Sequence, residues 1–439
     1  MSPMFNREVI RRIVDAQPFD VRKASIREMN RLVNAIEAEL HVRFIRMEFG
    51  IPGIPTSDIA VRAEIEALRE RRVGHVYAPF DGVPELKEEA ARFVKLFMNV
   101  SVPASCCVPV VGAMEGCFAA LALANRMTAH RQTVLMLEPG FPVNTQQARF
   151  LGMKTLGIDF YDHRGDTLLR AVDERLAKGD VCAVLWSSPN NPSWIVLREP
   201  ELAGLGKLCD THDVLAIEDL AYFGMDLRQD VTKPGVPPDQ PTVLSHTRNA
   251  ISIVSSSKMF SYAGQRIAIA VLHPDLAERR CPDLVERLGT SLVRHAFVHG
   301  IHYPLVASVP ESPQYGLLAL LRAANAGDSS LFAPAREYAR RAKAMKEIFL
   351  RHGFRLVYDN DLGEPLADGF YFTLSYPGFD DGADLIVEML HYGISAITLD
   401  ATGSIRKEGL RACVSLTGDD QLADLEARAA AFHADHPGR

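Results

Sequence analysis

Cysteine is scarce in the 439-residue sequence, and the seven cysteines form no Cys-x-x-Cys pair. Their number is odd, which does not suit a closed set of disulfides. Most of them lie in apolar stretches, where a free thiol behaves as a small hydrophobic side chain. The sequence therefore predicts a reduced chain in the cytoplasm rather than a disulfide-stabilised one.

Long apolar runs are also missing. No run approaches the length of about eighteen residues that a membrane-spanning helix needs. Residues 1–20 alternate charged and apolar side chains without the hydrophobic centre of a signal peptide. We therefore expect neither a membrane-spanning protein nor one that is exported by a signal peptide.

Positive charge is not in excess, since 48 lysines and arginines face 55 aspartates and glutamates and the net charge is −7. A nucleic-acid surface needs a basic patch or stripe, so we expect small molecules rather than nucleic acid as partners. Metal-ligand spacing is absent as well, because His295, His299 and His302 lack a carboxylate at helical spacing. We interpret these histidines as solvent-facing or substrate-loop residues and predict no metal site.

The apolar and charged fractions, 47% and 23%, are ordinary for a globular chain, and the length exceeds what one hydrophobic core supports. From residue 108, short apolar runs alternate with helical stretches. Continuous apolar runs are typical of strands buried on both faces, so we predict an α/β large domain with a mainly parallel mixed sheet sandwiched by helices. The predicted strands are 108–111, 134–137, 181–186, 214–217, 251–254 and 267–271.

A change of pattern near residue 330 predicts a second domain. A long helical stretch at 337–352 precedes apolar runs at 370–375 and 410–416. This order indicates a smaller α+β domain, which the N-terminal segment completes. The expected divisions are an N-terminal segment 1–72, a large domain 73–328 and a small C-terminal domain 329–439.

Lys258 stands beside hydroxyl side chains in the sequence Ser255-Ser256-Ser257-Lys258, and Arg266 follows eight positions later. The segment comes directly after the predicted strand 251–254. Lys258 should therefore lie in a loop at the end of a strand, where α/β proteins place their chemistry. A lysine taken alone is usually a solvated surface residue, so a functional interpretation depends on its companions.

Other chemistry-bearing residues also follow predicted strands. Gly112-Ala113-Met114 ends the first strand and begins a helix, whose backbone N–H groups can bind an anion. Phe141 follows the second strand and Asn191 the third. Asp219 follows the fourth, and because burying an isolated carboxylate is costly, it should meet a cation, a metal or a hydrogen-bond network. A protonated pyridine nitrogen would satisfy Asp219 as well as a protein cation.

With these motifs the chain resembles the fold-type I pyridoxal-phosphate-dependent aminotransferases of class I and II, the aspartate aminotransferase-like superfamily. The resemblance spans roughly residues 45–416. Its motifs stand in the family's order: Gly112-Ala113-Met114, Phe141, Asn191-Pro192, Asp219 with Tyr222, Ser255 to Lys258, Arg266 and Leu410-Arg411. The resemblance implies pyridoxal 5'-phosphate as the cofactor and a homodimer with shared active sites, in which residues 1–72 contribute dimer contacts and 73–328 bind the cofactor.

The resemblance also implies a role for each matching residue. Lys258 would form the Schiff base with the cofactor and then move the Cα proton of the substrate. Asp219 would keep the pyridine nitrogen protonated. Tyr222 and Asn191 would hydrogen-bond the phenolic oxygen, and Phe141 would stack on the ring. The phosphate would be bound by the Ala113 and Met114 N–H groups, Ser255, Ser257, Arg266 and the neighbouring subunit's residue that matches Tyr77.

For the substrate, the resemblance implies that Arg411 binds the α-carboxylate with help from Asn191, and that Gly50 lets the backbone pass close by. Two features depart from the family. Trp194 replaces the glycine of the usual Asn-Pro-Thr-Gly, and it packs either beneath the substrate pocket or against the neighbouring helix. The stretch 294–308 is longer than the usual connection, and we interpret it as a specificity loop or lid.

The residues leave the reaction open. Transfer of an amino group from an L-amino acid to a 2-oxo acid is the commonest outcome on this scaffold, so an aminotransferase is the first prediction. The alternatives are a β- or γ-eliminating lyase and an S-adenosylmethionine-using, ACC synthase-like enzyme. A cofactor-binding regulator without turnover is a remote alternative, because the roughly 45 residues before the motif that begins at Met47 and contains Gly50 leave no room for a winged helix. The sequence does not identify the amino donor or acceptor.

Overall fold

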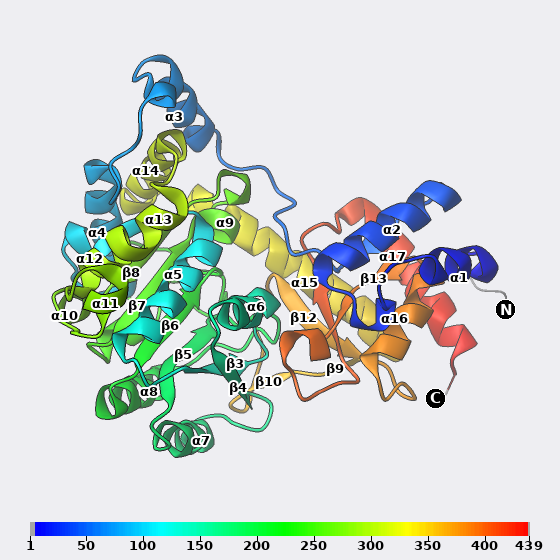
Figure 1. Cartoon of the computed structure of the whole chain (residues 1–439). Helices are drawn as coiled ribbons and strands as arrows, with labels where there is room; N and C mark the ends of the chain where they lie inside the picture. The colour runs from blue at the N-terminus through cyan, green and yellow to red at the C-terminus, as the bar shows by residue number, and fades with distance from the viewer. Residues whose placement is uncertain (1–4, 438–439) are drawn as a thin grey trace. The chain divides into compact units, whose positions relative to one another are not determined.

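The computed structural model describes residues 5–437; the outer ends of the predicted terminal segments, residues 1–4 and 438–439, lie outside the described residues. The chain forms two compact units. The large unit consists of Ile54–Asn190 and Val196–Pro334, and the small unit of residues 5–53, Asn191–Ile195 and residues 335–437. In Figure 1 the small unit combines the blue beginning of the chain with its orange and red end.

The large unit is built on one seven-stranded sheet with the strand order β2-β8-β7-β6-β5-β3-β4. Only β8 runs antiparallel to its two neighbours, so the sheet is mainly parallel and mixed, which confirms the predicted α/β class. The strands are β2 (Cys107–Val110), β3 (Thr133–Glu138), β4 (Lys154–Asp159), β5 (Val181–Ser187), β6 (Leu215–Leu220), β7 (Ala250–Ser255) and β8 (Ala268–Leu272).

The apolar runs of the sequence correspond to six of these strands, whereas β4 was not predicted. The reason lies in its position, because β4 is an edge strand that pairs only with β3. Lys154, Thr155 and Gly157 of β4 are exposed, so this strand has no continuous apolar run. The central strands β5, β6, β7 and β8 are buried along their whole length.

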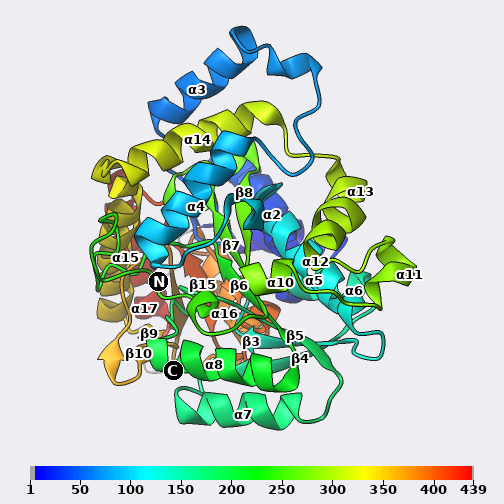
Figure 2. The ribbon, with the colours of Figure 1, turned by 90° about the vertical axis from the view of Figure 1, so that its left-hand side faces the viewer.

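Helices flank the sheet of the large unit. Helix α5 lies across β5, β6, β7 and β8, and it is buried along most of its length. Helices α7 and α8 lie side by side, and α3 packs along α14 (Figure 2). The helices are α3 (Asp58–Arg69), α4 (Pro84–Met98), α5 (Gly112–Met127), α6 (Pro142–Phe150), α7 (Asp166–Leu176), α8 (Glu199–His212), α9 (Ser256–Met259), α10 (Pro274–Ala277), α11 (Leu284–Leu288), α12 (Val293–His295), α13 (Tyr303–Val306) and α14 (Glu311–Asn325).

The small unit contains a four-stranded antiparallel sheet with the order β14-β15-β12-β9. The N-terminal segment joins this unit because β1 pairs in parallel with β13. This confirms the predicted α+β domain that the N-terminal segment completes. Its strands are β1 (Ile45–Arg46), β9 (Arg355–Leu356), β10 (Asn360–Asp361), β11 (Glu364–Pro365), β12 (Tyr371–Ser375), β13 (Ile394–Ser395), β14 (Ile397–Thr398) and β15 (Leu410–Cys413).

Helix α2 of the small unit shows why the N-terminal segment folds. Ser25 and Glu28 form a capping box at its start, in which each side chain accepts a hydrogen bond from the other residue's backbone N–H. The buried residues of α2 recur at three- and four-residue spacing, so one face packs into the core and the other stays polar. The helices of this unit are α1 (Arg7–Asp15), α2 (Ile26–Leu40), α15 (Ala333–Arg351), α16 (Gly382–Leu390) and α17 (Asp419–Asp435).

Within residues 5–437, no helix has both the length and the apolar character that crossing a membrane requires.

Candidate active site

Lys258 lies in α9, the short helix that follows β7 in the large unit. Ser255 caps this helix, since its Oγ accepts a hydrogen bond from the Ser257 backbone N–H at 3.2 Å. Ser256 Oγ donates to the Ile267 carbonyl at 2.6 Å, which ties the same turn to the segment before β8. The serines that flank the lysine in the sequence therefore hold its backbone, and Lys258 itself is half-buried.

Asp219 lies near the end of β6, the strand that pairs with β7. Burial raises the pKa of Asp219 to about 7, while the Ala221 backbone N–H and the charge of Lys258 act in the opposite direction. The structure thus brings the predicted acid and lysine within electrostatic reach of each other. Tyr222, three residues later, is buried in the loop that follows.

The start of α5 and Arg266 lie against each other. Gly112, the first residue of α5, has a φ of +71°, and a Cβ at this position would come within 2.4 Å of Arg266 Nη2. Arg266 Nη1 donates to the Ala263 carbonyl at 3.0 Å, and burial lowers the pKa of Arg266. The backbone N–H groups of Ala113 and Met114 belong to the first turn of this sixteen-residue helix, whose N-terminus attracts anions.

The donors and charges of the large unit fit pyridoxal phosphate. A phosphate needs helix N–H groups and a cation, which the start of α5 and Arg266 supply together. A protonated ring nitrogen needs a buried carboxylate, which Asp219 supplies. Phe141 is half-buried at the start of α6, after β3, and Tyr77 is 86% exposed.

Arg411 lies on β15 of the small unit and is 1% exposed. Its Nη2 donates to the Glu48 carbonyl at 2.6 Å, and its guanidinium carbon lies 4.9 Å from the centre of the Tyr371 ring. Tyr371 pairs with Cys413 across the sheet, so Arg411 is its diagonal neighbour on the same face. Among residues 5–437, Arg411 forms no ion pair, and its buried Nε has no hydrogen-bond partner. This buried cation is suited to bind an anionic ligand.

Trp194 and Gly50 both lie against Tyr371. A Cβ at Gly50 would come within 2.0 Å of Tyr371 Oη, so a side chain at this position would have to displace the Tyr371 ring. Trp194 is 1% exposed and has a φ of +64°, a conformation that favours the glycine of the related motif. Its indole ring centre lies 6.3 Å from that of Tyr371, and a Cβ at Gly369 would lie 2.1 Å from the indole. The indole therefore packs on Gly369 and on the ring that contacts Arg411.

The segment 294–308 of the large unit contains a π-helix at Ala296–His302. His302 is 1% exposed and its Nδ1 lies 3.2 Å from Glu115 Oε1, while Glu115 Oε2 accepts the Val111 backbone N–H at 3.1 Å. His295 and His299 are exposed, with their ring centres 4.4 Å apart. Within the described part of the chain, no group of three or more His, Cys, Asp and Glu side chains is arranged to hold a metal ion.

Comparison with known proteins identifies the family. The family model described as aminotransferase class I and II matches residues 47–350. A probable aspartate aminotransferase of Methanocaldococcus jannaschii is 25% identical over 279 residues, which cover 63% of this chain and 67% of that protein. A probable aspartate/prephenate aminotransferase of Aquifex aeolicus is 26% identical over 275 residues, 62% of each protein. These matches span about two thirds or less of the relatives' own lengths.

Solved structures share the fold over nearly the whole chain. The aspartate aminotransferase from Thermus thermophilus with maleate has a TM-score of 0.75 at 19% identity, and the likeness covers 96% of this chain and 98% of that one. The methionine aminotransferase YbdL from Escherichia coli has a TM-score of 0.74 at 17% identity. At these identities the structures establish the fold, and the family model spans more than half of the sequence. The chain belongs to the class I and II aminotransferase family.

Proposed function

We propose that the protein is an aminotransferase that uses pyridoxal 5'-phosphate to move an amino group from an L-amino acid to a 2-oxo acid. The observation that carries this proposal is the electrostatic contact between Lys258 and the buried Asp219, which adjacent parallel strands bring together. The family match supports it. The seven free, buried cysteines fit a reducing compartment such as the cytoplasm.

In this proposal the large unit provides the reacting groups. Pyridoxal phosphate, when bound, supplies an electron sink for the bonds at the substrate Cα. The Lys258 amine would hold the cofactor covalently, and the free amine would serve as the base that accepts and returns the Cα proton of the substrate. Asp219 would hold the proton on the ring nitrogen, Phe141 would stack on the ring, and Tyr222 and Asn191 would donate to the phenolic oxygen, Asn191 being the one of these residues that belongs to the small unit.

The proposed phosphate site is at the start of α5. The Ala113 and Met114 N–H groups and Arg266 provide charge-assisted donors, and the Ser255 and Ser257 hydroxyls are the further proposed contacts. Tyr77 is exposed on this chain, and we propose that it reaches the phosphate bound by a second copy. The active form would then be a homodimer with shared active sites.

The small unit provides the groups that bind the substrate. Arg411 binds the α-carboxylate through a guanidinium that the protein leaves without a carboxylate partner among the described residues, and Asn191 assists it. Gly50 keeps space beside Tyr371. Trp194 lies against the same ring and so borders the proposed carboxylate site.

Replacing Arg411 with alanine is expected to raise KM for the amino donor by about 10- to 150-fold, because a buried charge-assisted bond to a carboxylate contributes about 1.5–3 kcal/mol. kcat should fall less. Steady-state kinetics with varied donor measures both constants. Arg355→Ala, which removes an exposed arginine from the edge of the same sheet, is the control and should leave both unchanged. Unchanged constants in the Arg411 variant would show that another residue binds the carboxylate.

The proposed reaction is tested by incubating the cofactor-loaded protein with a panel of L-amino acids and 2-oxo acids and identifying the products. Aminotransfer releases one keto acid for each new amino acid formed, without free ammonia. Release of ammonia, a thiol or a thioether in place of a second amino acid would establish a lyase and overturn the proposal.

A further inference from the structure

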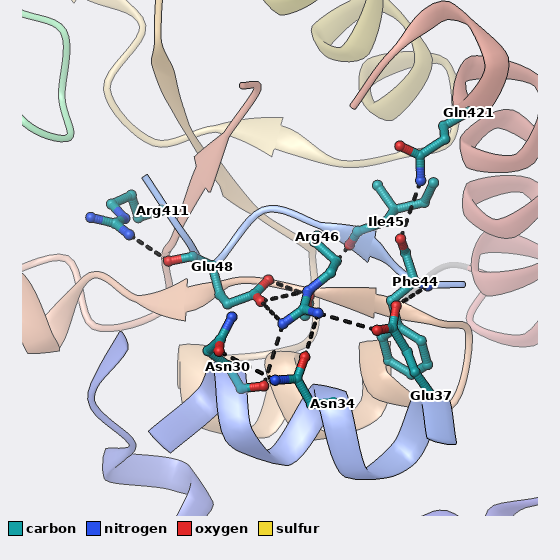
Figure 3. A network of polar contacts seen from close by, with 10 residues as sticks. Asn30, Asn34, Glu37, Phe44, Ile45, Arg46, Glu48, Arg411 and Gln421 are labelled. Carbon is teal, nitrogen blue, oxygen red and sulfur yellow. Dashed lines mark hydrogen bonds and ion pairs between the residues drawn. The ribbon is translucent and has the colours of Figure 1, made fainter. Parts of the chain in front are cut away.

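Arg46 forms a dense polar network with Glu48 in the small unit (Figure 3). Arg46 Nε and Nη2 both donate to Glu48 Oε1, at 3.0 and 2.9 Å. The second carboxylate oxygen, Oε2, accepts from Ser395 Oγ on β13 at 2.6 Å. The Glu48 side chain is 0% exposed and that of Arg46 is 18% exposed, so this ion pair is largely removed from water.

Helix α2 supplies the remaining partners of Arg46. Asn30, Asn34 and Glu37 recur at spacings of four and three residues, which places them on one face of the helix. Arg46 Nη1 donates to Asn34 Oδ1 at 2.6 Å and to Glu37 Oε2 at 3.1 Å. Nη2 also donates to the Asn30 carbonyl at 3.3 Å. The planar guanidinium is thereby fixed from three sides, which a single ammonium group would not achieve.

Glu48 links this network to Arg411. Its carboxylate is held by Arg46 and Ser395, and its main-chain carbonyl accepts the hydrogen bond from Arg411 Nη2 at 2.6 Å. This is the one hydrogen bond that the Arg411 side chain makes within residues 5–437; the other contact that orients its guanidinium is the Tyr371 ring. A movement of the Glu48 peptide would therefore turn the guanidinium of Arg411.

We propose that Arg46 is a positioning residue for the substrate carboxylate, acting through Glu48 on the orientation of Arg411. The inference rests on the proposed role of Arg411 and deepens it. Without Arg46, the buried Glu48 carboxylate has no cation, and it must take up a proton or turn toward water. Either change alters the side chain that anchors the Glu48 peptide, and the carbonyl that holds Arg411 moves with it.

The test is the Arg46→Met variant of the cofactor-loaded protein. We expect KM for the amino donor to rise about tenfold, while kcat stays within about twofold, because Arg46 acts on binding geometry and not on the reacting atoms. The inhibition constant of maleate, a dicarboxylate that carries no amine, should rise by a similar factor. A loss of folded protein lowers the amount of active enzyme but does not by itself change KM. A raised KM with a nearly unchanged kcat therefore distinguishes a positioning role of Arg46 from a purely structural one.

The control is Arg43→Met, three residues earlier. Arg43 pairs with Asp420 at the surface, where both side chains are 66% exposed, so its loss should leave KM and the maleate constant within about twofold of the parent. If the single variant does not fold, the double variant Arg46→Met with Glu48→Met provides the test, because an apolar pair can replace a buried ion pair without loss of stability. The double variant should keep the raised KM, since its Glu48 position has no polar anchor.

Unchanged KM and maleate inhibition in a folded Arg46 variant or in the double variant would overturn the proposal, provided that the parent transaminates. A parent that binds maleate but transfers no amino group would instead overturn the proposed function. In that case the role of Arg46 would be decided by the maleate inhibition constant alone, compared between the parent and the Arg46 variant.

Discussion

Lys258→Ala is expected to lower kcat for amino transfer by about four orders of magnitude or more. The substitution removes both the proposed covalent link to the cofactor and the base at the substrate Cα. General acid–base catalysis alone contributes about 10²–10⁴-fold. Helix α9 contains no lysine besides Lys258, so no neighbouring amine of this helix can take over. Steady-state rates with the best amino donor measure the effect.

A chemical readout separates the covalent role from a general loss of structure. Treatment of the loaded parent with sodium borohydride should add the reduced cofactor to the peptide that contains Lys258, as mass spectrometry would detect. The alanine variant should carry no such addition. Lys207→Ala, which changes an exposed lysine of α8, is the matched control and should keep activity and labelling. Full activity of the Lys258 variant, or labelling of another peptide, would contradict the central assignment.

The fold of the large unit could be predicted because its central strands are buried on both faces. Continuous apolar runs such as 181–186 cannot lie on a half-exposed surface, and their alternation with helices leaves a parallel sheet as the simplest arrangement. The same reasoning failed at β4. Its residues Lys154 and Thr155 face solvent at the sheet edge, so the strand is defined by pairing with β3 and not by its own hydrophobicity.

The pairing of Lys258 with Asp219 could also be anticipated. Both residues stand at the ends of predicted strands, and the ends of adjacent parallel strands meet at one edge of a sheet. Glu48 and Arg411 differ in this respect, because they are 363 positions apart and their contact uses a main-chain carbonyl. A carbonyl is present in every residue, so the sequence carries no signal for this bond.

The packing of the Trp194 side chain could not be predicted from the sequence either. The sequence marked Trp194 as a departure from the family pattern but left its packing open between two surroundings. The structure places the indole on Gly369 and beside Tyr371, on the strand β12 and the residues just before it. In the sequence, nothing distinguishes Gly369 from an ordinary loop glycine. Its close fit to an indole from residue 194 becomes visible only when the two segments are packed together.

Asp219→Asn is expected to change the pH dependence of stability in the cofactor-free protein. Burial raises the pKa of Asp219 from 3.8 to about 7, so between these values the folded protein holds a proton that the unfolded chain has released. Stability of the parent therefore falls as the pH rises through this window, by up to roughly 4 kcal/mol at about 1.4 kcal/mol per pH unit. Asparagine does not titrate, so the gain in Tm of the variant over the parent should grow from about pH 4 to pH 8.

Glu218→Gln is the companion variant that separates stability from function. Burial also raises the pKa of Glu218 to about 7, and its carboxylate accepts hydrogen bonds from Thr242 and Ser252. The Glu218 variant should show the same direction of pH dependence. It should keep most of the activity, because no reacting group depends on it. A difference in Tm between parent and Asp219 variant that is constant from pH 4 to pH 8 would show that Asp219 is already charged in the folded state.

With cofactor bound, the same Asp219 variant should lose about three orders of magnitude in kcat. Removal of one preorganised electrostatic group costs about 10²–10³-fold, and the loss of the proton on the ring nitrogen adds to this. In the cofactor-free protein the buried Asp219 carboxylate has no full cationic partner, which lowers the stability of the folded protein. For the same reason the carboxylate is available to pair with a cationic ring nitrogen and so to support catalysis. Added pyridoxal phosphate should therefore raise the Tm of the parent at pH 8 by more than it raises that of the Asp219 variant. Equal increases would mean that Asp219 does not face the ring nitrogen.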